Sequence, residues 1–298
     1  MVLAAAVLWG TVGPAQVLAG SEASPMALGG ARLLGGGILL SLLSLLSLRG
    51  GSAVRLMRRA PWPLLAAAAA TGIFQAAFFF SVARTGAALA TAVALGVTPV
   101  ATGIVDRMTG SRSPLGRAWL GGTAASVTGC ALLLLPGGSS SADPLGVLLA
   151  VVAGVCGAVY TVAAKHLADT GADMVTAVSL TLLVGGVLFT PWLVIEAEAL
   201  VTRASLLLIA WLALAATVLG YMLFVHGLRR IPASAAGTLS LAEPMVAAVL
   251  GLTVLGETLS PAALAGFLLL FGGLAAVALG GVSQSAPVAS SGCTHSPP

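Results

Sequence analysis

Two apolar stretches decide the fold: FFFSVARTGAALATAVALGVTPVATGIV at residues 78–105 and MLFVHGLRRIPASAAGTLSLAEPMVAAV at residues 222–249. Placing Pro99 opposite Pro244 aligns them without a gap. The same alignment pairs identical side chains, Phe79 with Phe224 and Arg84 with Arg229. A unit of membrane-spanning length that occurs twice in one chain is typical of transporters whose pathway lies between two repeats. The duplication therefore indicates both an architecture and a class of function.

The composition favours a chain embedded in a lipid bilayer. Hydrophobic residues make up 58% of the 298 residues, only 7% are charged, and the mean hydropathy is +1.08. Soluble domains carry about 25% charged residues, so this chain has too little charge to cover a surface exposed to water. The net charge of +4 comes mainly from arginines in short loops between apolar runs. That placement favours a role in setting topology over nucleic-acid binding.

The cysteines and the glycine runs predict no metal, no cofactor and no nucleotide site. Cys130 and Cys156 lie in apolar runs and Cys293 lies near the C-terminus, without a CxxC or other metal-ligand spacing. Three consecutive glycines at 35–37 lack the Lys-Ser/Thr that would follow in a phosphate-binding loop. We therefore expect close helix packing at these glycines instead.

Apolar runs of about 20 residues predict ten membrane-spanning helices in an all-α integral membrane protein. They cover residues 2–20, 27–48, 62–83, 86–106, 118–135, 144–165, 174–195, 204–226, 232–255 and 260–281. The first run is interpreted as a retained helix and not a signal peptide, because no basic segment precedes it and no clear cleavage site ends it.

The basic residues predict how these helices are oriented. With the N-terminus in the cytoplasm, the inner loops hold ten Lys or Arg and the outer loops hold two. The inner set is Arg49, Arg55, Arg58, Arg59, Arg107, Arg112, Arg117, Lys165, Arg229 and Arg230, and the outer set is Arg84 and Arg203. This is the positive-inside bias expected in a cytoplasmic (inner) membrane.

Five helices in each half imply that the two halves enter the membrane in opposite directions. The halves are residues 1–135 and 144–281, and such inverted repeats are the arrangement used for alternating access. The remaining residues, 282–298, are rich in Ser and Pro and are predicted to form a disordered tail. Both termini are then cytoplasmic.

Five short motifs resemble the EamA family of the drug/metabolite transporter superfamily. They are AVLWGT at 6–11, PMALGGAR at 25–32, TPV at 98–100, EP at 243–244 and GETLS at 256–260. The resemblance extends over nearly the whole chain. It implies a ten-helix, inverted-repeat carrier with both ends in the cytoplasm, of a kind that often exports metabolites or amino acids.

Glu243 and Arg32 are the two charged residues that are predicted to lie inside membrane spans and not at the span ends. Glu243 falls near mid-membrane, where a carboxylate is costly unless it is paired, protonated or wetted by a cavity. Pro244 after it removes a backbone donor, a common device at transporter sites. Glu243 is thus either a proton- or substrate-responsive group or a structural carboxylate. Arg32 either contacts Glu243, directly or through substrate, or extends to the outer headgroups.

Five further residues are candidates for the substrate pathway. Trp9 lies near the middle of the first span, where an indole either packs between helices or lines the pathway. Thr98 occupies the position in the first repeat that Glu243 occupies in the second. Gln75, Tyr160 and Tyr221 place polar tips inside apolar spans, which suits the orientation of a small polar solute.

These features predict a secondary transporter that works by alternating access on a small neutral or zwitterionic metabolite, such as an amino acid. Arg32 is the one basic residue predicted for the cavity. Phosphorylated solutes need several cationic groups, so they are disfavoured as substrates. Protons are a candidate coupling ion through Glu243. The alternatives are a lipid or amphiphile flippase, a scaffold on the same repeats, or a membrane-embedded enzyme. The predicted partners are the substrate and the lipid bilayer, with a monomer or weak homodimer as the assembly.

A stripe of small residues on the fifth span predicts close helix packing. Gly121, Ala125 and Gly129 recur at a spacing of four, which places them on one helix face. We expect this face to pack within the same molecule, with a contact to a second protomer as the alternative.

Overall fold

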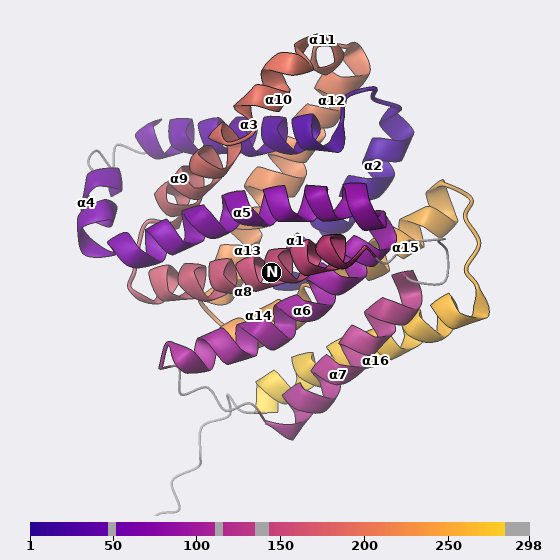
Figure 1. Cartoon of the computed structure of the whole chain (residues 1–298). Coiled ribbons are helices and arrows are strands. Elements are labelled where there is room, and N and C mark those ends of the chain that lie inside the picture. The colour runs from indigo at the N-terminus through magenta and orange to yellow at the C-terminus, as the bar shows by residue number, and fades with distance from the viewer. Residues whose placement is uncertain (47–51, 111–115, 135–142, 284–298) are drawn as a thin grey trace, which may run out of the picture.

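The chain folds entirely into helices wherever its structure is described. The computed structural model (Figure 1) describes residues 1–46, 52–110, 116–134 and 143–283, and no strand occurs in these ranges. Most of the predicted tail, from residue 284 onward, lies outside the described residues, and the last helix continues to Ser283.

The helices of the first half are α1 (Val2–Gly10), α2 (Val12–Ala19), α3 (Pro25–Leu46), α4 (Ser52–Arg59), α5 (Pro61–Thr85), α6 (Ala87–Met108) and α7 (Arg117–Leu134). Those of the second half are α8 (Pro144–Asp169), α9 (Met174–Val187), α10 (Thr190–Ile195), α11 (Ala197–Leu200), α12 (Arg203–Trp211), α13 (Gly220–Leu228), α14 (Ala233–Leu239), α15 (Ala242–Val254) and α16 (Pro261–Ser283). A π-helical segment, Leu212–Leu219, joins α12 to α13.

Eight segments of the described chain are long and apolar enough to cross a membrane. They are Val2–Ala19, Pro25–Leu46, Pro61–Thr85, Ala87–Met108, Pro144–Asp169, Arg203–Leu228, Ala233–Val254 and Pro261–Gly280. The predicted fifth and seventh spans are not among them. The fifth is α7, which is 18 residues long and begins with Arg117. The seventh is divided at Leu188 and Phe189 into α9 and α10.

Local sequence explains where several helices begin and turn. Proline, whose fixed φ suits the first helical turn, begins α3, α5, α8 and α16. A single residue, Gly86, separates α5 from α6 and has φ +81°, a left-handed value that glycine adopts without strain. The same end of α5 is tied to α8, because Arg84 Nη1 lies 2.8 Å from Asp143 Oδ2. That hydrogen bond lowers the pKa of the Asp143 carboxyl below its ordinary value.

Besides the seventh, three predicted spans contain a break or an irregular segment in the helix. The first is interrupted at Thr11, between α1 and α2, close to Gly13 and Pro14. The span over 232–255 is interrupted at Ser240 and Leu241. Because Pro244 has no N–H to donate, the Ser240 carbonyl accepts instead from the Glu243 N–H at 3.0 Å. The third irregularity is the π-helical segment, a form that often marks functional sites.

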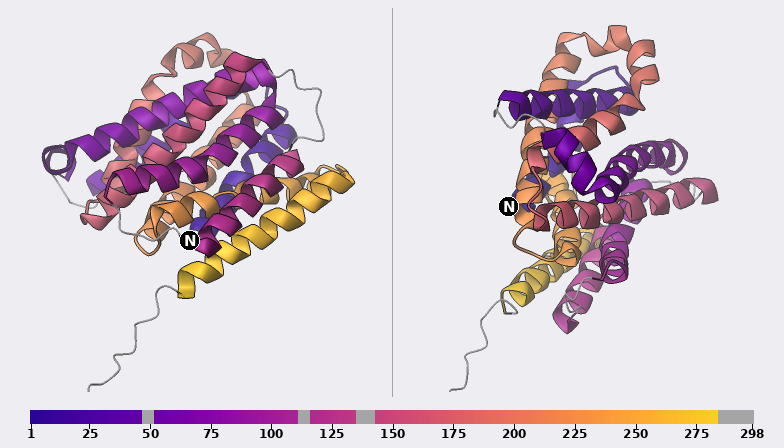
Figure 2. Two further views of the ribbon diagram at one scale, coloured as in Figure 1. Left: turned by 60° about the horizontal axis from the view of Figure 1, so that its bottom comes forward. Right: turned by 90° about the vertical axis from the view of Figure 1, so that its left-hand side faces the viewer.

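Helices α7 and α16, which were predicted as the fifth spans of the two halves, pack closely along each other (Figure 2). A Cβ placed on Gly129 would lie 2.6 Å from the Gly266 carbonyl oxygen, and one on Gly122 would lie 2.8 Å from that of Gly273. The prediction of intramolecular packing is therefore confirmed, but the predicted register is wrong by one position at its start. Gly121 is exposed and no atom lies within 4 Å of a Cβ placed on it.

Candidate functional site

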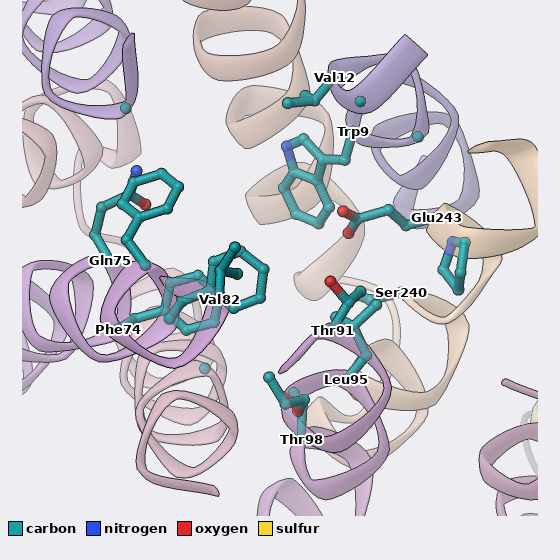
Figure 3. Close-up of a pocket in the computed structure, with 18 of the residues that line it drawn as sticks. Trp9, Val12, Phe74, Gln75, Val82, Thr91, Leu95, Thr98, Ser240 and Glu243 are labelled. Carbon is teal, nitrogen blue, oxygen red and sulfur yellow. The ribbon is translucent and has the colours of Figure 1, made fainter. Parts of the chain in front are cut away.

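The seven residues predicted for the pathway all line one central cavity of about 540 Å³ (Figure 3). They are Trp9, Arg32, Gln75, Thr98, Tyr160, Tyr221 and Glu243. They come from α1, α3, α5, α6, α8, α13 and α15, so the cavity lies where helices of both halves meet. Sequence reasoning found them because polar side chains are rare within apolar spans.

The cavity reaches one end of the bundle. Its lining includes residues next to the turns that join α2 to α3 and α5 to α6, namely Gln16, Pro25, Val82 and Ala87. The lining residues of α15 run from Glu243 toward the turn before α16, and include Ala247. All these turns lie on the same side of the bundle (Figure 1). A solute can therefore reach the centre from this end.

Direct helix contacts fill the space between the cavity and the opposite end. Gly237 of α14 packs on α6, since a Cβ there would lie 2.9 Å from Thr102 Oγ1. The hydroxyls of Thr123 and Thr238 are hydrogen bonded at 2.9 Å, which joins α7 to α14. Thr102, Thr123 and Thr238 are all buried. The cavity therefore opens toward one membrane face.

Arg32 and Glu243 are the charged side chains among the described residues that line the cavity. Arg32 Nη2 donates a hydrogen bond of 3.3 Å to Gln75 Oε1. The predicted direct contact with Glu243 is wrong, because the structure forms no ion pair between these two described residues. Gln75 holds the guanidinium at the α5 wall, whereas Glu243 extends from α15 on the other side (Figure 3). The contact through a substrate remains a prediction.

An aromatic cluster forms the wall beside α1, α8 and α13. The ring centroid of Trp9 lies 5.6 Å from that of Tyr221 and 5.3 Å from that of Phe224. Tyr160 faces Tyr221 edge-on at 5.6 Å. Trp9 Nε1 donates 2.9 Å to the carbonyl oxygen of Ala216, in the π-helical segment. The indole therefore both packs between helices and lines the cavity, so the two interpretations of Trp9 are compatible.

Two buried polar groups beside the cavity have no hydrogen-bond partner within the described protein. They are the Tyr160 hydroxyl and Gln75 Nε2, and Gln75 is only 3% exposed. Buried polar groups are usually paired, so these two retain unused hydrogen-bonding capacity. Because neither atom is exposed to the cavity, a solute reaches them only if these side chains shift. Thr98 differs, because its hydroxyl donates to the carbonyls of Ala94 at 2.8 Å and Gly154 at 3.2 Å. Its side chain lines the cavity, but its hydroxyl is already engaged.

Five polar residues of the lining were not predicted from the sequence: Gln16, Thr71, Thr91, Thr161 and Ser240. The helical spacing between Ser240 and Glu243 is a signal that could have identified Ser240, because residues three apart share a helix face. The hydroxyl of Ser240 donates 3.0 Å to the Ala236 carbonyl of its own helix.

The position of Gln75 depends on a glycine across the cavity wall. A Cβ on Gly29 would clash with Gln75 Nε2 and lie 2.5 Å from Phe79 Cε2. Gly29→Ala is expected to displace the flexible amide of Gln75. Substrate binding should then weaken roughly tenfold, because the hydrogen bond between the Gln75 amide and the charged Arg32 is lost. The KM for transport by the purified, reconstituted protein measures this. Gly272→Ala, where no atom lies within 4 Å, is the control, and an unchanged KM in Gly29→Ala would contradict the assignment.

The fold and this cavity define the chain as a multi-span membrane protein of the transporter class. It belongs to the EamA-like transporter family, which matches residues 1–135 and 144–279. The chain is similar to the uncharacterized transporter YwfM of Bacillus subtilis, with 35% identity over 275 residues, 92% of this chain and 90% of that protein. It is also similar to the threonine/homoserine exporter RhtA of Escherichia coli K12, with 34% identity over 203 residues, 67% of this chain and 65% of that protein.

A solved structure entitled "Crystal structure of protein" has the same fold. It superposes with a TM-score of 0.78 and covers 96% of this chain and 97% of its own. The sequence identity is 21%, so this likeness concerns the fold alone.

Proposed function

We propose that this protein is a secondary carrier that exports a small zwitterionic metabolite of the amino-acid type across the cytoplasmic membrane. One observation carries the proposal: the cavity lining presents one cationic side chain, Arg32, and one anionic side chain, Glu243, which are not paired with each other. An amino acid carries both opposite charges and can neutralise each of them. The name of RhtA, a threonine/homoserine exporter, supports the same class of substrate and the outward direction.

In this proposal each charge of the substrate meets one wall. The carboxylate accepts hydrogen bonds from Arg32, which Gln75 Oε1 holds in place, and the ammonium faces Glu243. The buried Nε2 of Gln75 becomes a second donor only if the amide turns toward the cavity. Charge-assisted hydrogen bonds of this kind are about twice as strong as neutral ones. The aromatic cluster around Trp9 is suited to contact the rest of the solute.

The proposed architecture is ten spans in two inverted repeats, residues 1–135 and 144–281. Matching helix contacts support this division. The third span of the first half, α5, packs on α8, the first span of the second half, and the third span of the second half, through α13, packs on α1. The fourth span of each half shows the same pattern, because α6 packs on α8 and α15 packs on α1. Such reciprocal contacts are expected when one repeat is related to the other by a pseudo-twofold axis.

The proposed orientation makes the observed cavity outward-facing. With ten basic residues in the inner loops and two in the outer loops, the turns beside the cavity mouth lie outside the cytoplasm. The packing of Gly237 on Thr102 then closes the cytoplasmic side. Alternating access requires this contact to open while the outer ends of the helices approach each other. Glu243 is the proposed site for a coupled proton, and uncoupled downhill efflux is the alternative.

Reconstitution tests the proposal directly. Proteoliposomes containing the purified protein are assayed for exchange of radiolabelled threonine, homoserine, a sugar phosphate and a fluorescent phospholipid, with and without a pH gradient. Exchange of an amino acid without movement of the other two is expected. Movement of the phospholipid alone would favour the flippase. Exchange of the sugar phosphate would exclude the cavity with one cationic and one anionic side chain as the substrate site.

The native cysteines provide a probe of cavity access. Cys156 lines the cavity, whereas Cys130 is fully buried, with an exposed fraction of 0%. In a Cys293→Ser background, a membrane-impermeant thiol reagent added outside the cell is expected to modify Cys156. Saturating substrate should slow the modification at least fivefold, because a bound solute occupies the same space.

The control for this labelling experiment is Cys156→Ser, which should remove the signal. Labelling that occurs only when the reagent is added to the outside of inverted vesicles, where the cytoplasmic face is exposed, would contradict the proposed orientation. Labelling that substrate does not slow would contradict the cavity as the binding site.

A further inference from the structure

Helix α4 runs across the end of the bundle instead of through it. In Figure 1 it lies at the far left and crosses the ends of α3 and α5, opposite the turns beside the cavity mouth. The apolar runs on either side predict only a basic loop for this segment. A helix that crosses the ends of spanning helices lies parallel to the membrane surface, where water, headgroups and acyl chains meet.

The eight residues of α4 separate into apolar and basic faces. Leu56 is buried, with an exposed fraction of 6%, and α4 packs on α5 and α9. Val54 and Met57 are three residues apart and share a second apolar face, turned away from the one that Leu56 buries, and they remain 54% and 49% exposed. Apolar side chains left open beside a charged face are typical of a helix that rests in the membrane interface.

Three arginines form the basic face of α4. Arg55, Arg58 and Arg59 are all exposed, and none forms an ion pair with the residues that the structure describes. A topogenic role explains their side of the membrane but not their collection on one face of an amphipathic helix. Guanidinium groups bind phosphate through paired, parallel hydrogen bonds, so this face fits an anionic headgroup.

We propose that α4 is a docking surface for anionic phospholipid, with phosphatidylglycerol as the representative chemistry. Val54 and Met57 enter the acyl region, and Arg55, Arg58 and Arg59 hold the phosphodiester groups. Charge complementarity supports this occupant, since juxtamembrane basic segments attract anionic lipid, by roughly fivefold per arginine. The lipid would fix the position of α4 and, through Leu56, the inner ends of α5 and α9. The inference does not depend on which solute the cavity carries.

Lipid titration of the detergent-purified, full-length protein tests the inference. Thermal stability is followed as dioctanoyl-phosphatidylglycerol, dioctanoyl-phosphatidylcholine or inorganic phosphate is added. Phosphatidylglycerol is expected to reach half of its maximal effect on thermal stability at a concentration at least tenfold lower than phosphatidylcholine. High salt should weaken this preference. Inorganic phosphate alone should have little effect. Equal responses to the two lipids would overturn the proposal.

Variants assign the preference to α4. The triple variant Arg55→Gln/Arg58→Gln/Arg59→Gln should lose the preference for phosphatidylglycerol, and the triple Lys variant, which keeps the charge, should retain most of it. The control is Arg229→Gln/Arg230→Gln, at an exposed loop that is not on α4. If the Gln triple variant does not fold, the three single Gln variants should each weaken the preference about fivefold. A preference that survives in all α4 Gln variants, or that is lost equally in the control, would refute the docking surface.

Discussion

Glu243→Gln is expected to lower amino-acid exchange in proteoliposomes at least tenfold while leaving folding intact. Glutamine has the same shape as glutamate but no negative charge, and Glu243 is the anionic side chain of the described cavity lining. The ammonium group of a zwitterion would then lose its charged partner, and hydrogen bonds to charged groups contribute about 1.5–3 kcal/mol. Initial rates of exchange with and without a pH gradient, together with KM, measure the effect.

The matched control for this prediction is Glu257→Gln, which removes a carboxylate just past the C-terminal end of α15 that does not line the cavity. Exchange by this variant should stay near the wild-type rate. If Glu243→Gln exchanges amino acids as fast as the wild type, the ammonium site at Glu243 is excluded. If only the response to the pH gradient disappears, Glu243 couples protons without binding the substrate, and the zwitterion proposal fails while coupling is supported.

The pattern of broken and continuous helices divides the cavity into two kinds of wall. Gln75, Thr98 and Tyr160 lie on α5, α6 and α8, which run without interruption, even through Pro99. Trp9 and Glu243 lie next to interruptions, and Trp9 bonds to the π-helical segment. Breaks leave backbone groups that can change partners. The wall that carries Glu243 is therefore the one better able to change shape when a solute binds.

The membrane spans and the cavity residues could be predicted because each depends on a contrast in the sequence. Long apolar runs contrast with short basic loops, and single polar residues such as Gln75 contrast with the apolar spans around them. Pairwise contacts could not be predicted in the same way. Arg32 forms a hydrogen bond with Gln75 and not with Glu243. Whether two side chains meet across a cavity depends on how the helices pack, and a similar depth in the membrane does not determine that packing.

Helix faces were the least predictable feature, for a physical reason. In a soluble helix the buried face is apolar and the exposed face is polar, but in lipid both faces are apolar. On α7 no difference in residue type separates Gly121, which is exposed, from Gly122, which packs on α16. The amphipathic helix α4 was missed for a related reason, because its arginines were interpreted only as loop charges that set the topology.

Gly129→Leu is expected to prevent stable packing of α7 on α16. A Cβ at this position would meet the backbone of α16, with the Gly266 carbonyl oxygen at 2.6 Å and the backbone nitrogen of Leu270 closer still. Gly266 is equally constrained, since a Cβ on it would lie 2.7 Å from the Gly129 carbonyl oxygen. Backbone atoms cannot move aside by a change of rotamer, so the helices must separate. Overpacking of this kind costs typically 1–3 kcal/mol and occasionally more.

The measurement is the monodisperse fraction on size-exclusion chromatography and the melting temperature in detergent, which should fall by roughly 5–10 °C. Gly121→Leu adds the same side chain to the same helix, where no atom lies within 4 Å, so it should leave both values close to those of the wild type. Equal losses in the two variants would mean that leucine disturbs α7 itself, and no loss in either would mean that α7 and α16 do not depend on glycine contact. Destabilisation confined to Gly129→Leu would instead identify close backbone approach, and not general hydrophobicity, as what holds α7 and α16 together.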